Sequence, residues 1–152
     1  IIAGVESDFI YPAGIYLSRS LHELKENARI LGIECPQCNT IWLPPQVICS
    51  FCHAETGDNW VEMGPRGSVV NWILSHIPSF DLETKELITS HRPAAVINLD
   101  GPGDRGANFL HYLEETDMDK ITEGMLVEAV FKPREERKGQ PNDIQFFRTV
   151  TD

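Results

Sequence analysis

The chain has 152 residues, of which 41% are hydrophobic and 24% are charged, and its formal net charge is −10. These values are typical of a soluble globular protein with one ordinary domain or a small module joined to a compact one. No apolar run approaches the roughly 18 residues of a membrane-spanning helix, which argues against a membrane protein. A surface this negative repels a phosphate backbone, so general nucleic-acid binding is disfavoured.

Residues 1–33 predict an N-terminal arm with one helix. Ser20-Leu21-His22-Glu23 fits a capping box, in which the serine caps the helix and the glutamate reaches back to the cap. Apolar residues then recur at helical spacing, and Gly32 ends the run. The apolar positions of this stripe are Leu21, Leu24, Ala28 and Leu31.

Two CxxC motifs, Cys35 to Cys38 and Cys49 to Cys52, are separated by ten residues. A tight turn at each motif brings both sulfurs to the same side, so four thiolates can complete a tetrahedral shell around one zinc ion. Such a shell leaves no open position for a substrate, which indicates a structural zinc site. An iron site of the rubredoxin type has the same ligands and stays open as an alternative. Paired CxxC motifs without secretory features indicate a reducing compartment, and we expect the cytoplasm.

The cysteines define a predicted zinc ribbon over residues 34–62. From Glu34 to Met63 there is no Lys or Arg, whereas ribbons that bind nucleic acid need cations for the phosphates. The loop between the two motifs, residues 41–45, is apolar and stiff. We expect this loop to pack on the neighbouring domain or on another protein. Asn39 and His53 follow the two motifs, where the turn requires a left-handed backbone that both residues tolerate.

Residues 63–152 predict a five-stranded OB-fold barrel. The first strand, Ser68 to Ile77, follows a turn at residues 64–67 and is apolar on both faces, as expected for a strand that bends between two sheets. A short helix is predicted over 116–124, between the third and fourth strands, as in an OB-fold. The four later strands are predicted at Ala94–Leu99, Ala107–Leu113, Leu126–Phe131 and Ile144–Val150.

No segment predicts a catalytic site. The four cysteines are assigned to the metal, no GxSxG, HExxH or P-loop motif is present, and the five histidines are dispersed. Gly101–Gly106 matches GxGxxG, but a dinucleotide site also needs a following helix, so a glycine-rich hairpin is expected.

The connection before the last strand carries four cations, diluted by Glu135 and Glu136. We expect a solvated hairpin tip there, with a phosphate contact as the alternative. These cations are Lys132, Arg134, Arg137 and Lys138.

Nearly the whole chain resembles a family of small acyl-CoA-associated proteins that join a rubredoxin-like zinc ribbon to an OB-fold and accompany thiolases. The resemblance rests on both CxxC motifs, on Pro44-Pro45 before the second motif, on Gly64–Val69 leading into the first strand, and on Gly124–Glu128 opening the fourth. What it implies is a non-catalytic subunit whose thiolase-type partner holds the catalytic cysteine. The OB-fold would then help to accommodate the CoA-linked substrate.

The resemblance also implies a setting. Members of this family serve in mevalonate synthesis, in steroid side-chain degradation and in anaerobic degradation of aromatic compounds. Within the last group, the small subunit of a benzoylsuccinyl-CoA thiolase is the finest prediction for this chain. Two other classes stay open from the residues alone, a single-stranded nucleic-acid-binding OB-fold and an iron-containing electron carrier.

Overall fold

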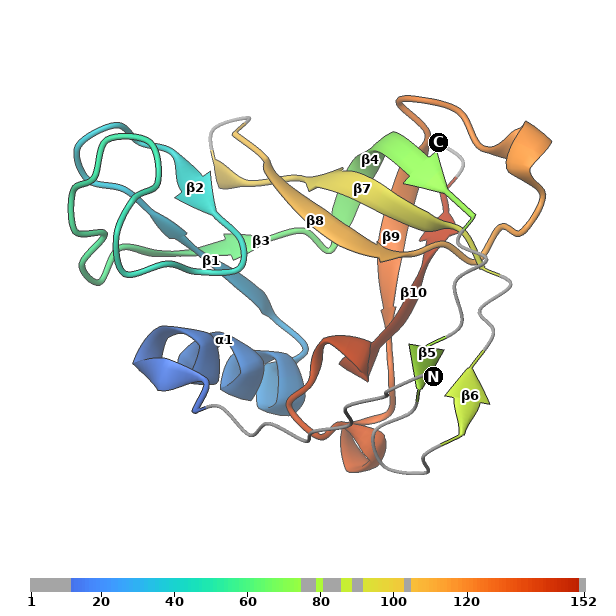
Figure 1. Ribbon diagram of the computed structural model, residues 1–152, viewed down its shortest axis with the longest axis horizontal. Coiled ribbons are helices and arrows are strands. Elements are labelled where there is room, and N and C mark those ends of the chain that lie inside the picture. Colours follow the sequence, from blue (N-terminus) through green and yellow to red (C-terminus); the bar gives the residue numbers. More distant parts are fainter. Residues whose placement is uncertain (1–11, 75–78, 81–85, 89–91, 103–104, 151–152) are drawn as a thin grey trace, which may run out of the picture.

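The computed structural model describes residues 12–74, 79–80, 86–88, 92–102 and 105–150. These residues form a mainly β protein with one α-helix (Figure 1). Short 3₁₀ turns lie at Met118–Lys120, Arg134–Glu136 and Pro141–Asp143. In chain order the other elements are α1 (Gly14–Asn27), β1 (Ile30–Glu34), β2 (Ile41–Trp42), β3 (Trp60–Met63), β4 (Arg66–Ile73), β5 (Ser79–Phe80), β6 (Leu87–Ile88), β7 (Ala94–Leu99), β8 (Ala107–Tyr112), β9 (Leu126–Phe131) and β10 (Ile144–Thr149).

The strands form a ribbon sheet, a barrel sheet and a small hairpin. The ribbon sheet has the order β2-β1-β3 and carries the cysteine motifs. The five-stranded sheet has the order β10-β9-β4-β7-β8, and a parallel bridge between Leu113 and Phe147 joins its two ends. This order and this closure are those of an OB-fold barrel. The predicted fold class is therefore confirmed.

The barrel strands match their predicted ranges closely. β7 and β9 have the predicted bounds, and β8 and β10 each end one residue earlier. β4 begins two residues earlier, at Arg66, and ends at Ile73, while residues 75–77 of the predicted strand lie outside the described residues. Strand formation at these positions follows from their branched and aromatic side chains, which pack well on a pleated surface.

β4 is not covered on both faces, which corrects the prediction. Val69 is fully buried, but Ile73 is 63% exposed and Val70 is also exposed. The pairing register with β7 shifts between Val69 and Asn71, so Val70 occupies a bulge in the strand. Only the inner face of β4 therefore contributes to the barrel core.

The bounds of the predicted N-terminal helix are wrong. α1 ends where Ala28 adopts a left-handed conformation, with φ 52°. Ser20 does not cap the helix; it lies inside α1, buried, and its hydroxyl donates a hydrogen bond to the Leu31 carbonyl at 3.0 Å. Leu31 and Gly32 belong to β1, which pairs with both β2 and β3. Pairing on two sides of β1 outweighs the helical periodicity that continues through Leu31 in the sequence.

The helix predicted over residues 116–124 is also wrong in length. The structure has one 3₁₀ turn, Met118–Lys120, in which the Asp117 side chain accepts a hydrogen bond from the Asp119 N–H at 3.2 Å. Ile121 then leaves the helical region, with φ −83° and ψ 125°, and is buried in the core. Insertion of this side chain into the core ends the turn.

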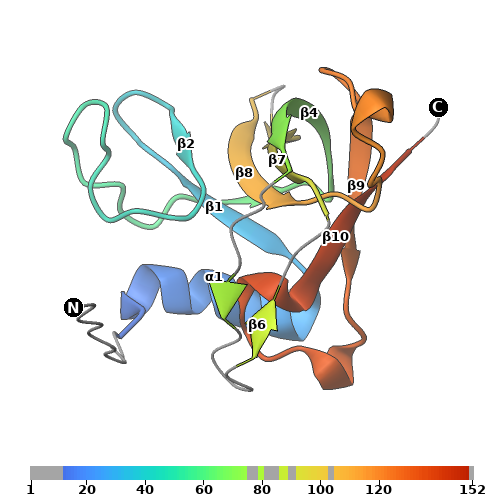
Figure 2. The same ribbon diagram turned by 45° about the vertical axis from the view of Figure 1, so that its right-hand side comes forward.

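One hydrophobic core connects all three parts of the molecule. Leu24 of α1, Ile41 of β2 and Met63 of β3 belong to the same buried cluster as Val69 and Phe147 of the barrel. α1 lies beneath the ribbon sheet and reaches the connection between β9 and β10 (Figures 1 and 2). The division into an arm (1–33), a ribbon (34–62) and a barrel domain (63–152) stays a prediction.

Within the described residues, no helix has the length and apolar character that crossing a membrane requires.

Two of the four cations before β10 hold α1 in place, so this connection is not simply a solvated tip. The Arg137 guanidinium donates to the Lys25 carbonyl at 2.9 Å, near the end of α1, where the helix carbonyls lack partners. Arg134 forms an ion pair with Glu26 at 2.9 Å. Cations near the C-terminus of a helix also interact favourably with its dipole. These two arginines therefore stabilise the packing of α1 on the barrel.

Candidate metal centre

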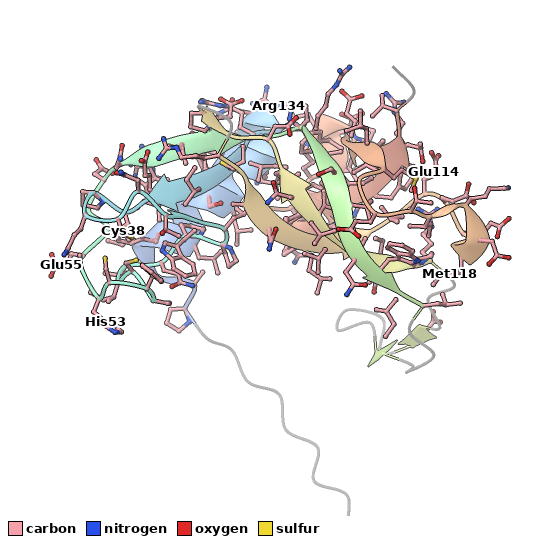
Figure 3. The ribbon with its side chains drawn as sticks, turned by 90° about the horizontal axis from the view of Figure 1, so that it is seen from above. Cys38, His53, Glu55, Glu114, Met118 and Arg134 are labelled. Atoms are coloured by element: carbon pink, nitrogen blue, oxygen red, sulfur yellow. The ribbon has the colours of Figure 1, made fainter. Side chains whose placement is uncertain are left out.

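The two CxxC motifs form equivalent turns. In each turn the N–H of the residue after the motif donates to the carbonyl of the first cysteine, from Asn39 to Cys35 and from His53 to Cys49, at 2.9 Å in both. Asn39 and His53 have φ values of 58° and 62°. The predicted left-handed conformation at both positions is confirmed. His53 is exposed on the outside of its turn and is not a metal ligand (Figure 3).

The four sulfurs converge on one point between the turns. All four Sγ atoms lie within 4.8 Å of one another, with Cys35 and Cys52 3.4 Å apart and Cys38 and Cys49 3.6 Å apart. A tetrahedral shell with Zn–S bonds of about 2.3 Å has sulfurs about 3.8 Å apart, so the arrangement fits a zinc ion. Cys35 and Cys49 are fully buried and the other two are half-buried. This site has no position left for a substrate.

Two side chains outside the motifs contact the sulfurs. The Trp42 indole N–H donates to Cys49 Sγ at 3.3 Å. Cys38 Sγ lies 3.2 Å from Thr40 Oγ1, and hydrogen bonding with Thr40 lowers the pKa of the Cys38 thiol. Such contacts orient the first-shell ligands and tune their basicity.

Without a cation, the four thiols differ in their tendency to ionise. Burial raises the pKa of Cys49, but hydrogen bonds from the Cys52 N–H and the Trp42 indole outweigh it and lower this pKa to about 6. At Cys52 the Ala54 N–H lowers the pKa, while burial and the three neighbouring sulfurs raise it to about 12. A divalent cation removes this inequality because it binds each cysteine as a thiolate.

Three acidic groups of the ribbon, Glu34, Asp58 and Glu62, pair with arginines from outside it. Arg105, which lies within the Gly101–Gly106 stretch, pairs with Glu34 and also donates to the Asn39 carbonyl at 3.2 Å. It therefore ties the ribbon to the barrel. Two cations of the N-terminal region act similarly; the pairs are Arg19 with Asp58 and Arg29 with Glu62.

The glycine-rich stretch is a hairpin, as predicted. β7 and β8 pair antiparallel up to Leu99 and Ala107, on either side of it. A Cβ at Gly101 would lie 2.0 Å from the Arg105 carbonyl oxygen, so only glycine fits there. This close approach explains the glycine without a nucleotide.

The apolar loop over residues 41–45 packs inward, on the barrel side of the molecule. Ile41 belongs to the common core and Leu43 packs against it. The exposed apolar side chains of the ribbon are instead Val47, Ile48 and Phe51, and Phe51 is 76% exposed. The exposure of these three residues was not predicted from the sequence. The available signal was the position of Phe51 between two ligands, in a turn too tight for its side chain to reach a core.

No protein-family model matches the chain. The chain is 26% identical over 114 residues to a DUF35 domain-containing scaffold protein of Methanocaldococcus jannaschii, and the match covers 75% of each protein. A solved structure named Ltp2-ChsH2(DUF35) aldolase is similar, with a TM-score of 0.55, 22% identity, and coverage of 91% of this chain and 98% of that one. A DUF35 protein of unknown function from Sulfolobus solfataricus gives a TM-score of 0.48 at 18% identity, with coverage of 93% and 86%. At 22% identity, the likeness to the Ltp2-ChsH2(DUF35) structure is one of fold.

Proposed function

We propose that this chain is a non-catalytic accessory subunit of the DUF35 kind, which docks on an acyl-CoA enzyme through its ribbon. The observation that carries the proposal is the exposure of three apolar side chains within five residues of the ribbon, Val47, Ile48 and Phe51, which we name the knob. Large apolar side chains gathered on a polar surface are typical of protein–protein contacts. The similarity to a scaffold protein supports the same role.

The position of Phe51 suits it to be an anchor. It lies in the turn between Cys49 and Cys52, whose backbone is held by the sulfur cluster. A rigid aromatic side chain loses little conformational entropy when a partner buries it, and such residues dominate binding energy at interfaces. The partner surface that fits the knob is an apolar pocket.

The metal has a structural role in this proposal. Zinc bound by Cys35, Cys38, Cys49 and Cys52 would fix both turns and hence the knob. Four-cysteine coordination leaves the ion without an open position, so it supplies folding free energy and no chemistry. The colour of the purified protein distinguishes zinc from iron, because a four-cysteine iron site absorbs visible light and a zinc site does not.

The finer proposal comes from the family resemblance. The partner is a thiolase-type enzyme that holds the reacting cysteine, the substrate is a CoA thioester, and the setting is the cytoplasmic, anaerobic degradation of aromatic compounds through benzoylsuccinyl-CoA. The chain has four cysteines in all, and each is assigned to the metal, so a nucleophilic cysteine must come from the partner.

No observation favours nucleic-acid binding. An OB-fold binds single strands mainly through its second and third strands, here β7 and β8. Neither strand contains Lys or Arg. The outward side chains of β8 include Leu110 and Tyr112, both exposed. With no cation on these two strands and a net charge of −10 for the chain, β7 and β8 offer nothing to neutralise a phosphate backbone.

The test is recovery of the partner with a tagged chain from the native host, comparing wild type with Phe51→Ser. We expect wild type to retain a thiolase-type protein and one zinc per chain. Phe51→Ser should reduce partner recovery at least about tenfold, as expected for an interface anchor, and leave the zinc content unchanged. Leu126→Ser removes an exposed leucine from β9 and serves as the matched control.

Three results would reject the proposal. Equal partner recovery by wild type and Phe51→Ser would reject the knob as the docking site. Recovery of the zinc protein without any acyl-CoA enzyme would reject the accessory role. Turnover of an acyl-CoA by the isolated chain would reject the non-catalytic assignment.

A further inference from the structure

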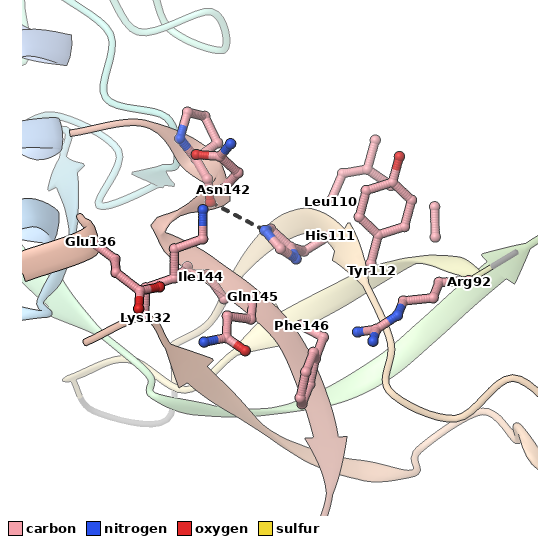
Figure 4. Close-up of a pocket in the computed structure, with 12 residues that line it drawn as sticks. Arg92, Leu110, His111, Tyr112, Lys132, Glu136, Asn142, Ile144, Gln145 and Phe146 are labelled. Carbon is pink, nitrogen blue, oxygen red and sulfur yellow. Dashed lines mark hydrogen bonds between the residues drawn. The ribbon is translucent and has the colours of Figure 1, made fainter. Parts of the chain in front are cut away.

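A second site lies in the barrel, away from the cysteines. A cavity of about 740 Å³ opens where β8 and β10 come together to close the barrel (Figure 4). We name it the closure cavity and define it by Leu110, His111, Tyr112, Lys132 and Phe146, which surround it with seven further residues. Its volume lies in the range of small-molecule sites, about 300–1,000 Å³.

The closure cavity has an apolar platform. Leu110 is 66% exposed, although leucine is usually buried, and Tyr112 beside it is also exposed. Ala94 pairs with Tyr112 across the sheet and adds a further apolar wall. On the opposite strand, β10, the Phe146 ring lies under the Arg92 guanidinium, 4.7 Å from the ring centroid. These groups suit a flat or branched apolar body.

The described residues that line the closure cavity include three charged groups, Lys132, Arg92 and Glu136, in a chain whose net charge is −10. Among the described residues, Lys132 has no ion pair, whereas Arg134 pairs with Glu26. Arg137 is also engaged, because it donates to the Lys25 carbonyl. One ammonium without an ion pair balances a monoanion, whereas a phosphate dianion would need more cations.

His111 also lines the closure cavity. Its Nε2 lies 3.2 Å from the Pro141 carbonyl oxygen and donates to it, so this nitrogen is already paired. Its Nδ1 is buried and offers the cavity no polar contact. The imidazole ring therefore forms a wall of the site, and the charge of a ligand must be met by another side chain.

From these observations we infer that the closure cavity binds an organic monocarboxylate with an aromatic or branched apolar body. The body lies on Leu110, Tyr112 and Phe146, and the carboxylate meets the Lys132 ammonium. This assignment goes beyond the accessory role, because it gives the isolated chain a ligand of its own. The accessory role and the ligand site can be tested separately, because the accessory role needs a partner protein and ligand binding does not.

The test is a titration of the full isotope-labelled chain, purified with its metal, with 3-phenylpropionate. We expect saturable backbone-amide shift changes centred on residues 110–112, 132 and 146, and a dissociation constant below about 10 mM by calorimetry. The neutral 3-phenylpropanamide, which has the same body without the charge, should bind at least about tenfold more weakly.

Variants locate the charge. Lys132→Gln should weaken 3-phenylpropionate binding at least about tenfold, and Lys132→Arg should retain it. Lys120→Gln, in the 3₁₀ turn at Met118–Lys120, is the matched control and should change nothing. Shift changes that do not saturate, equal binding of the amide, or unchanged binding by Lys132→Gln would overturn the site. Tighter binding of phenyl phosphate than of the carboxylate would overturn the ligand class.

Discussion

The ribbon and the closure cavity are built in opposite ways. The four cysteines lie within 18 residues, and two local turns bring their sulfurs within 4.8 Å of one another. The residues of the closure cavity come from positions 92 to 146 and meet only because β8 and β10 approach each other at the barrel seam. One site depends on local turn geometry and a metal, whereas the other depends on the whole barrel.

This difference separates the two sites in what can disturb them. Loss of a cysteine acts directly on the ribbon, because four ligands complete one shell and no protein group can replace one of them. The closure cavity should keep its shape when a single lining side chain is lost, but not when the seam between Leu113 and Phe147 is lost. Perturbing each site alone therefore tests whether the two are energetically independent.

The largest effect is expected for Cys49→Ser. We expect loss of zinc and loss of hydrogen-exchange protection in β1, β2 and β3, because structural zinc supplies about 10–16 kcal/mol of apparent free energy in zinc-finger peptides. The melting temperature of the barrel should also fall, since Ile41 and Met63 share a core with Phe147. Metal analysis measures the zinc loss, hydrogen exchange measures the lost protection of the ribbon strands, and thermal unfolding measures the melting temperature of the barrel.

Ser50→Ala changes the neighbouring residue of the same turn, whose hydroxyl donates to Gln46 on the surface at 2.6 Å. This control should keep one zinc per chain. If Cys49→Ser retained zinc and full protection of β1, the four-cysteine assignment would be wrong. If it lost zinc but the barrel melted as in wild type, the ribbon and the barrel would be independent despite their common core.

A smaller effect is expected for Trp42→Phe. The substitution keeps an aromatic ring in place but removes the N–H that donates to Cys49 Sγ at 3.3 Å. Loss of a contact outside the first ligand shell typically weakens metal affinity about 10–100-fold, and for one neutral donor we expect about tenfold. Competition with a chromophoric zinc chelator measures the change.

Trp60→Phe is the matched control, because the Trp60 indole N–H donates to Asp58 rather than to a sulfur. Its zinc affinity should equal that of wild type. A Trp42→Phe protein with wild-type zinc affinity would show that the indole contributes packing alone.

The ribbon could be predicted from the sequence because its information is local. The CxxC spacing, together with Asn39 and His53 at left-handed positions, determines both turns within a few residues. The barrel strands were also predictable, since each carries its own run of branched and aromatic residues. The closure with the order β10-β9-β4-β7-β8 followed from the strand count and the OB-fold pattern.

The sequence-based predictions were wrong at positions where contacts between residues far apart in the chain determine the local structure. Ser20 and Glu23 fit a capping box by spacing, yet Ser20 bonds to the Leu31 carbonyl from inside α1. Arg137 lies in a basic loop, and nothing in the sequence around it predicts its hydrogen bond to the carbonyl of Lys25, 112 positions away. The closure cavity was missed for the same reason, because its residues converge only in the folded chain. Phe51 was missed although its position between two ligands carried a signal.

The smallest effect is expected for His111. Its titration reports on the barrel seam and not on the metal site. Burial lowers the pKa of His111, and its contact with the Pro141 carbonyl only partly offsets this. In the unfolded chain a histidine has a pKa of about 6.5, so below that pH the unfolded state binds more protons than the folded state. The free energy of unfolding should therefore fall as the pH decreases from about 6.5 toward the lower pKa of His111 in the folded protein. Above about pH 6.5, the titration of His111 should not change the free energy of unfolding.

His111→Gln removes this titration. We expect the difference in unfolding free energy between wild type and His111→Gln to shift in favour of the variant as the pH falls below about 6.5. Thiolate protonation also destabilises the ribbon in acid, but it is common to both proteins and cancels in the difference. A difference independent of pH between 5 and 8 would mean that His111 is solvated in the folded chain and that the closure cavity admits water to its ring.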